Sequence, residues 1–251
     1  MSIEACAEIV QRSDPERFAA LMAAPVGDRA TLAVLYAFNA ELARAPWASK
    51  EPMIAEMRLQ WWRDVIEAEA QGPAQPHEVA SPLGKLIRTK ALPLDLLDGM
   101  AAARQWDIYR DPHADEAGLW AYLEATGGAL MQVSALALGA AASSGPSALA
   151  LGTGQALANY LRAVPKLEEL GRVPLLDGTR AGVAALARAG LLRLAEARQP
   201  LPRGAALAAY LTRPVLEMAV RDPALVAEGK LVPTEFTRRK RLLWQSLTGH
   251  Y

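Results

Sequence analysis

The sequence predicts a single all-α domain, and three observations support this prediction. Of the 251 residues, 52% are apolar, so one large domain has enough side chains to build a core. Strong helix formers dominate, and runs of β-branched residues that alternate with polar ones are missing. The connections are short and rich in Pro and Gly, so no linker divides the chain. We therefore expect one domain over residues 1–251.

Start and stop signals divide the chain into helices. Asp14-Pro15 pairs an N-cap with a proline at the first helical position. Asp28 and Ser49 are expected to cap the next two helices, and Gly72-Pro73 ends the second of these. The predicted helices are, in order, Glu16–Ala24, Arg29–Arg44, Glu51–Gln71, Glu78–Lys90, Pro93–Tyr109, Asp115–Ala141, Pro146–Leu170, Thr179–Arg198, Arg203–Val220 and Thr234–Leu247.

The stretch from Thr126 to Leu161 contains no charged residue and is the nearest thing to a membrane span. A Ser-Ser-Gly-Pro sequence at 143–146 splits it into halves that are shorter than the ~20 apolar residues a span needs. We therefore expect two helices buried in a large core. Gly127-Gly128 costs about 1 kcal/mol per glycine against alanine inside a helix. Close helix packing and approach of the backbone to a ligand explain these glycines equally well.

Charge and cysteine usage exclude several functional classes. The 27 basic and 27 acidic residues balance, which argues against a nucleic-acid partner because such proteins carry a basic excess. The single cysteine excludes an internal disulfide framework and a Cys-rich zinc site. The three histidines have no second ligand at metal-binding spacing, so no metal is predicted. The first residues resemble no signal peptide, which favours a cytoplasmic protein.

Three local clusters each have a functional and a structural explanation. Asp64 and Glu67 lie one helical turn apart and could share a metal, although a solvated helix face explains them more simply. Glu168-Glu169 stand at a helix end where the macrodipole disfavours carboxylates, and ion pairs with neighbouring cations would account for them. Trp61-Trp62 point about 100° apart, so one could line a cavity or face a partner while the other packs in the core.

Near the C-terminus, four consecutive cations precede an aromatic residue in an otherwise apolar patch. Such a segment could hold an anionic membrane surface, at about 1 kcal/mol per cation near the headgroups, or form a plain basic helix face. The candidate membrane contacts are Arg238, Arg239, Lys240, Arg241 and Trp244.

Five motifs in the same order resemble those of the squalene/phytoene synthase family. They are Arg29–Phe38 with its Leu-Tyr-Ala-Phe ending, Arg58–Arg63, Leu92–Asp107, Tyr122–Gly139, and Gly154–Arg162 followed by Gly171-Arg172. The resemblance implies an isoprenoid (terpenoid) synthase-like helical bundle around a central cavity. It also implies head-to-head condensation of two prenyl diphosphates, with Mg²⁺ held by carboxylates on two facing helices.

Both acidic motifs of the family are lost in this chain. Residues 43–47 read Ala-Arg-Ala-Pro-Trp where the family has Asp-Asp-x-x-Asp, and residues 163–167 read Ala-Val-Pro-Lys-Leu where it has Asp-x-x-Glu-Asp. Pro46 and Pro165 are further expected to disturb the helical turns that would present ligands. We therefore predict a scaffold with no catalytic residue and no cofactor, in which Arg44 and Lys166 could still bind an anion by charge alone.

A closer resemblance is to a degenerate branch of the family that includes a mitochondrial respiratory complex I assembly factor. The shared motifs are Phe-Asn-x-Glu-Leu-Ala, Met-Arg-x-Gln-aromatic-Trp and Leu-Arg-Ala-x-Pro. The resemblance implies a non-catalytic factor at the inner face of the cytoplasmic membrane, with a complex I subunit or module as its partner. The cavity would remain as a relic or as a pocket for a lipid or prenyl chain. Candidate pocket or partner-facing residues are Tyr36, Asn39, Glu41, Arg58, Gln60, Trp61, Gln155, Asn159, Arg162 and Arg172.

The alternative is a divergent prenyltransferase of the squalene/phytoene synthase type. It would bind Mg²⁺ through carboxylates outside the lost motifs, with Asp64, Glu67, Asp107 and Glu168-Glu169 as the candidates.

Overall fold

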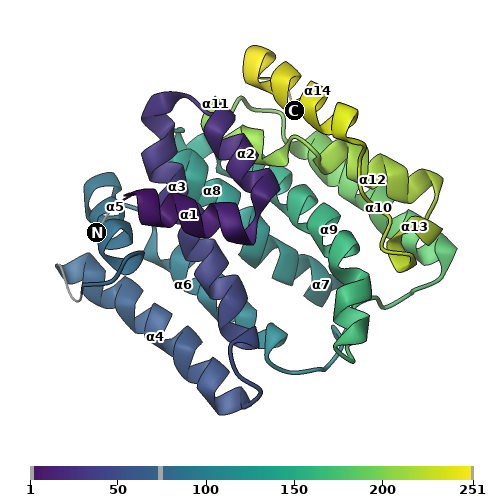
Figure 1. The fold of residues 1–251 in the computed structure, drawn as a ribbon, viewed down its shortest axis with the longest axis horizontal. Helices are drawn as coiled ribbons and strands as arrows, with labels where there is room; N and C mark the ends of the chain where they lie inside the picture. The colour runs from purple at the N-terminus through teal and green to yellow at the C-terminus, as the bar shows by residue number, and fades with distance from the viewer. Residues whose placement is uncertain (1–2, 73–75, 250–251) are drawn as a thin grey trace.

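The computed structural model describes residues 3–72 and 76–249, and within them the regular elements are helices (Figure 1). The helices are α1 Ile3–Ser13, α2 Pro15–Ala23, α3 Val26–Arg44, α4 Pro52–Gln71, α5 Ala80–Lys90, α6 Leu94–Ala103, α7 Glu116–Leu123, α8 Ala129–Ala137, α9 Gly145–Glu169, α10 Arg180–Glu196, α11 Arg203–Ala206, α12 Thr212–Arg221, α13 Ala224–Ala227 and α14 Glu235–Thr248. The all-α prediction is confirmed.

The core is built around α3 and α9, which carry the longest buried runs. In α3, every residue from Leu32 to Phe38 is buried. In α9, most residues from Ser147 to Leu167 are buried, and Asn159 and Lys166 are the exposed ones in this range. This helix packs against α8, α10 and α12. The two predicted core helices between Thr126 and Leu161 are thus confirmed as α8 and the first part of α9. Within the described residues, no helix combines the length and apolar character needed to cross a bilayer.

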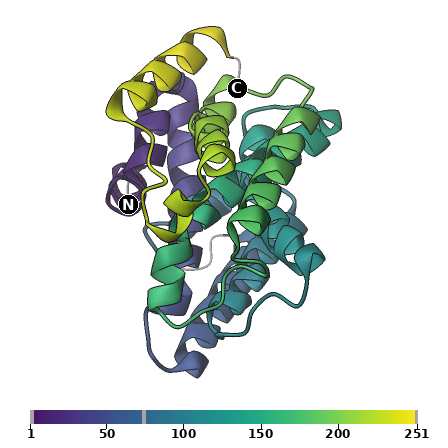
Figure 2. The ribbon, with the colours of Figure 1, turned by 90° about the vertical axis from the view of Figure 1, so that its right-hand side faces the viewer.

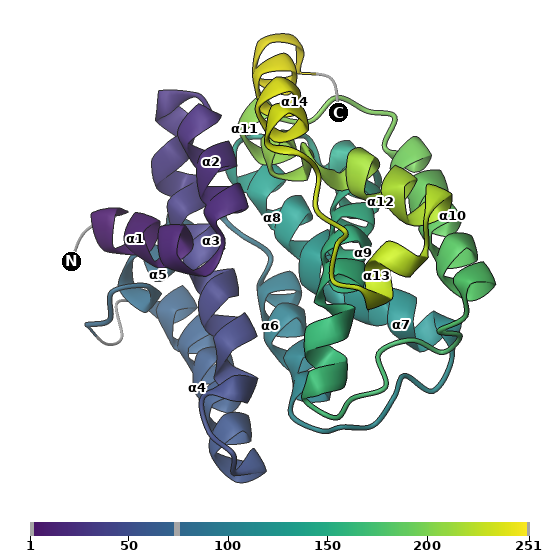
Figure 3. The same cartoon turned by 45° about the vertical axis from the view of Figure 1, so that its right-hand side comes forward.

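The outer helices divide into two groups around this core. Figure 3 shows α4 extending away from the rest beside the end of α3, and α4 packs against α5 and α6. At the other end of the molecule, α14 lies across the N-terminal helices and contacts α2 (Figure 2). The last helix therefore packs against the second helix of the chain.

Of the three predicted N-caps, the structure confirms Asp14 and corrects Asp28 and Ser49. The Asp14 side chain accepts a hydrogen bond from the Arg17 backbone N–H, as expected of an N-cap. Asp28 does not cap α3, because this helix begins two residues earlier, at Val26, and places Asp28 in its first turn, where its charge suits the macrodipole. Ser49 accepts from the backbone N–H of Glu51, and α4 begins only at Pro52. Gly72 ends α4 as predicted, and Pro73 lies outside the described residues.

Three predicted helices are interrupted. A 3₁₀ turn over Arg104–Asp107 follows α6, and another over Leu207–Ala209 separates α11 from α12. Between α7 and α8 the chain forms a π-helical turn, Glu124–Gly128. Helix α1 and the short α13 were not predicted, so both are additions to the predicted helices.

The two prolines at the lost acidic motifs behave differently. Pro46 lies in a 3₁₀ turn, Ala45–Trp47, that ends α3, as expected. Pro165 does not interrupt α9, which continues through it to Glu169. Because Leu161, Val164 and Leu167 are buried in the core, their packing holds the helix together where Pro165 cannot donate its backbone hydrogen bond.

Gly127 and Gly128 lie where the π-helical turn touches α9. A Cβ at Gly127 would come within 2.6 Å of the Ala156 Cβ, and one at Gly152 of α9 would come within 2.4 Å of the Gly127 carbonyl oxygen. Of the two explanations that the sequence left open, close helix packing therefore accounts for these glycines.

Candidate functional site

Two adjoining cavities lie beside α3. The α1–α3 cavity, of about 620 Å³, is enclosed by α1, the start of α2 and one face of α3. The α3–α9 cavity, of about 300 Å³, lies between the end of α3, the π-helical turn and α9. Asp14, Arg17, Asn39 and Ala43 line both, so the two form one continuous recess. A recess bounded by α3 and α9 is the place where the resemblance puts the central cavity.

The segments 43–47 and 163–167, which replace the two acidic motifs of the family, contribute no carboxylate to the walls of the α3–α9 cavity. Ala43 and Trp47 line the wall formed by the end of α3, and Ala163 and Leu167 line the wall formed by α9. Magnesium prefers hard oxygen ligands in octahedral geometry, which methyl groups and rings cannot supply. Throughout the described part of the chain, no three His, Cys, Asp or Glu side chains gather into a group that could hold a metal ion. The residues present therefore do not fit the family's Mg²⁺ site.

The two cations at the lost motifs are held in local ion pairs. Arg44 lies 2.7 Å from a Glu41 carboxylate oxygen, and Lys166 lies 2.9 Å from one of Glu169. Both pairs join residues three apart on one helix, and both cations are more than two-thirds exposed. An anion in the cavity would therefore have to compete with a glutamate for either charge.

The buried Arg17 side chain pairs with the partly exposed Asp14 where the two cavities meet. Its guanidinium Nε donates to Asp14 at 3.0 Å, and its planar face lies 5.0 Å from the Tyr36 ring centroid. Burial is the main reason that the pKa of Tyr36 rises to about 12, so its phenol stays neutral at pH 7. The positive charge of Arg17 is thus matched inside the protein by Asp14.

A second buried cluster lines the α3–α9 cavity and consists of Arg104, Asp107 and Tyr122. The Arg104 guanidinium donates to an Asp107 carboxylate oxygen at 3.1 Å and to the Tyr122 hydroxyl at 2.9 Å. The Tyr122 hydroxyl in turn donates to the Asp107 carboxylate at 3.0 Å. Burial raises the pKa of Tyr122 well above its ordinary value, so the phenol keeps its proton. All charged side chains that line this cavity are therefore paired.

Arg172 lies behind the cavity wall and ties together the segments around it. Its guanidinium lies between two rings, 4.6 Å from the Trp106 centroid and 5.2 Å from that of Trp47, and donates to the backbone oxygens of Trp106 and Asp107. His113 stacks on Trp106 with a centroid distance of 4.0 Å. Burial lowers the pKa of His113, so its ring is neutral at pH 7. This aromatic stack fixes the 3₁₀ turn that carries Asp107.

The predicted pocket residues fall into three groups. Those that line the cavities are Tyr36, Asn39, Glu41, Gln155 and Asn159. The second group consists of Arg162, whose guanidinium lies 2.6 Å from a Glu16 carboxylate oxygen, and the buried Arg172. Arg58 and Gln60 lie on the exposed face of α4, where Gln60 donates to Asp64, and Trp61 packs against Trp62 and His77. The structure thus brings the α3 and α9 residues together and leaves those of α4 apart.

Sequence reasoning did not select Arg17 or Arg104 as site residues. Arg104 and Asp107 are three residues apart, a spacing that suggests a helical ion pair but does not reveal its burial. Arg17 lies beside a recognised N-cap, and only the packing of α2 on Tyr36 places it in the cavity.

The carboxylates proposed for the alternative Mg²⁺ site do not converge. Asp64 and Glu67 are exposed on α4, and Glu168 and Glu169 are exposed at the end of α9. Only Asp107 lines a cavity, and it is bound to Arg104 and Tyr122.

Comparison with known proteins places the chain among isoprenoid-forming enzymes and their relatives. The sequence model of the squalene/phytoene synthase family matches residues 10–175. A human protein described as NADH dehydrogenase (ubiquinone) complex I, assembly factor 6, is 26% identical over 162 residues, which cover 64% of this chain and 48% of the human protein. The chain thus spans about half the length of the curated relative that it matches.

Solved structures share the fold. Squalene synthase HpnC from Alicyclobacillus acidocaldarius superposes with a TM-score of 0.75 and 16% identity, covering 90% of this chain and 94% of its own. A dehydrosqualene synthase solved with a ligand gives a TM-score of 0.78 at 16% identity, with coverages of 99% and 97%. YisP from Bacillus subtilis subsp. subtilis strain 168 gives 0.64 at 20% identity, with coverages of 96% and 94%. The predicted isoprenoid synthase-like fold is confirmed.

Proposed function

The chain belongs to the squalene/phytoene synthase family, and we propose that it is a non-catalytic member that serves as an assembly factor for respiratory complex I. The walls of its cavity lack the carboxylates of the family's two acidic motifs. The observation that carries the non-catalytic part is the presence of Ala43 and Ala163 on the facing cavity walls. The assembly role rests on the likeness to the human assembly factor. The partner would be a subunit or module of complex I, and the protein would act in the cytoplasm at the inner membrane face.

The cavity suits an uncharged chain better than a diphosphate. In the α3–α9 cavity the charged side chains already form the Asp14–Arg17 and Arg104–Asp107 pairs, so a diphosphate would find no unpaired cation and no unpaired carboxylate to hold Mg²⁺ there. Apolar groups such as Leu123, Leu130 and Leu167 line the same space. We propose a lipid or prenyl tail as its occupant, with no metal or cofactor taking part.

The assembly role is tested by deleting the gene from its host. Membranes of the deletion strain are expected to lose NADH-driven quinone reduction several-fold while succinate-driven reduction stays unchanged, because only complex I would be incomplete. Expression of the wild-type chain should restore the NADH activity. Equal NADH oxidation in the deletion and parent strains would contradict the role.

The non-catalytic state is tested separately with purified protein. Incubation with farnesyl or geranylgeranyl diphosphate and Mg²⁺ is expected to release no diphosphate, because neither cavity wall supplies the metal ligands. A squalene synthase assayed in parallel serves as the positive control. Diphosphate release that EDTA abolishes would instead support the divergent prenyltransferase.

A further inference from the structure

Helix α14 attaches to the rest of the protein through polar contacts and through Leu242, which packs against the core. Gln245, only 4% exposed, donates from its side chain to the Ala206 carbonyl oxygen at 2.7 Å. Arg238 lies 3.3 Å from a Glu16 carboxylate oxygen, and Arg203 donates to the Ser246 carbonyl oxygen at 3.2 Å. The inner side of this helix therefore carries polar groups beside Leu242, whereas a surface helix normally turns its polar groups to water.

The outer side of α14 exposes four large apolar side chains. Phe236, Leu243, Trp244 and Leu247 are 75%, 61%, 57% and 69% exposed. Helical geometry places Phe236, Leu243 and Leu247 within about 40° of one another, with Trp244 about 60° to one side. The exposed Lys240 lies among them. Figure 1 shows this helix at the edge of the molecule, at the end opposite the start of α4. An apolar face presented to solvent by a helix with a polar inner side indicates a docking surface.

The cations around this face are not all equivalent. Arg238 pairs with Glu16, and Arg239 pairs with Glu235 at 2.7 Å. Within the described residues the ion pairs of α14 are those of Arg238 and Arg239, and Lys240, Arg241 and Arg213 of α12 take part in none. Of the four predicted membrane-contacting cations, two are therefore neutralised locally and two are available.

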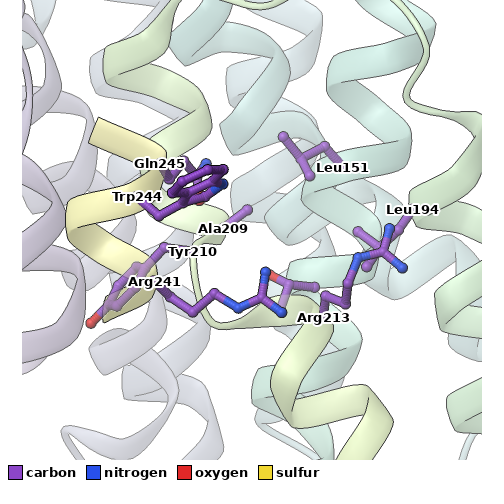
Figure 4. A pocket seen from close by; sticks show the side chains of 9 residues that line it. Leu151, Leu194, Ala209, Tyr210, Arg213, Arg241, Trp244 and Gln245 are labelled. Atoms are coloured by element: carbon purple, nitrogen blue, oxygen red, sulfur yellow. The ribbon is translucent and has the colours of Figure 1, made fainter. Parts of the chain in front are cut away.

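Arg213 and Arg241 line one narrow pocket between α12 and α14. In Figure 4 the Arg241 side chain extends from α14 toward the segment that carries Arg213, and the Trp244 ring lies above it. The hydroxyl of Thr212, a residue 3% exposed that lines the same pocket, has no hydrogen-bond partner. The pocket volume is about 20 Å³, so it admits one small group such as a phosphate oxygen at its mouth.

We infer that α14 docks flat on an anionic bilayer, with one lipid phosphate at the mouth of the pocket between Arg213 and Arg241. The apolar residues Phe236, Leu243 and Leu247 would enter the acyl boundary, and the Trp244 ring would lie at headgroup level. Unpaired cations beside an exposed apolar face complement an anionic lipid surface in both charge and polarity, which favours this occupant over a protein. The inference does not depend on the complex I role, because it concerns a surface away from the cavities.

Vesicle binding by the full chain tests the charged part of this surface. Binding to phosphatidylcholine vesicles that contain phosphatidylglycerol should exceed binding to phosphatidylcholine alone and should weaken as salt rises. The variant with Arg213→Gln, Lys240→Gln and Arg241→Gln should bind the anionic vesicles about a hundredfold more weakly, since each of the three cations contributes about fivefold.

A matched control variant removes three positive charges from a part of the protein distant in sequence from α14. Lys50, Lys85 and Lys90 are exposed on or before helices α4 and α5, and their joint replacement by glutamine should leave vesicle binding unchanged. Equal losses in the two triple variants would overturn the inference, because total charge rather than α14 would then control binding. Absence of binding by the wild-type protein would also overturn it and would point to a protein partner for this face.

The apolar part is tested by replacing Leu243 and Leu247 with serine. Both side chains are exposed, so the fold should be unaffected, while binding to anionic vesicles should fall at least tenfold. Amide hydrogen exchange should slow in α14 when vesicles are added to the wild-type protein. Protection confined to other helices would contradict the placement of the bilayer at this face.

Discussion

Replacement of Asp107 by alanine is expected to lower the free energy of unfolding by about 3–5 kcal/mol, the usual loss when one partner of a buried ion pair is removed. Asp107 is 5% exposed, and Arg104 would remain buried without its counterion. The Tyr122 hydroxyl would also lose the carboxylate to which it donates. Urea or guanidinium denaturation of the wild-type and variant proteins measures the loss.

A matched ion pair on the surface provides the control. Lys166 and Glu169 have the same three-residue spacing and nearly the same N···O distance, 2.9 Å against 3.1 Å, but their side chains are 71% and 66% exposed. Replacement of Glu169 by alanine is expected to change stability by no more than about 0.5 kcal/mol. Similar losses from the two replacements would show that the Asp107 cluster is not desolvated as the structure indicates.

These two ion pairs show how far the sequence could predict the site. Both consist of a cation followed three residues later by a carboxylate, so sequence spacing does not distinguish them. The difference in burial arises because Arg172 and His113 pack on Trp106 of the turn that carries Asp107, and they reach this turn only in the folded chain. A site defined by burial could therefore not be identified from local spacing.

The helices were more predictable because their signals are local. Asp14-Pro15 and Gly72 mark their helix ends through backbone geometry and capping, which need no partner from elsewhere in the chain. The π-helical turn at Glu124–Gly128 could not be predicted, because the turn is accommodated by contact with α9. Pro165 was expected to disturb a turn inside the helix predicted over Pro146–Leu170, and the tertiary packing of α9 keeps that helix continuous.

Replacement of Gly152 by alanine is expected to lower the free energy of unfolding by about 2–3 kcal/mol, although alanine is the better helix former by about 1 kcal/mol. The added Cβ would lie 2.4 Å from the Gly127 carbonyl oxygen and 2.9 Å from the Gly128 Cα. Because these are backbone atoms, no side chain can turn aside, and α9 must move away from the π-helical turn. Thermal and chemical denaturation of the purified variant measure the loss.

Gly99 in α6 is the matched control, because a Cβ there would meet nothing within 4 Å. Its replacement by alanine should leave stability unchanged or raise it by about 1 kcal/mol, as helix propensity alone predicts. Stabilisation by both replacements would mean that α9 and the π-helical turn are not in close contact.

Gly127 also lines the α3–α9 cavity, so the movement forced by the Gly152 variant should alter the wall of that cavity. The same close contact thus supports both the fold and the shape of the recess in which we propose that an apolar chain binds.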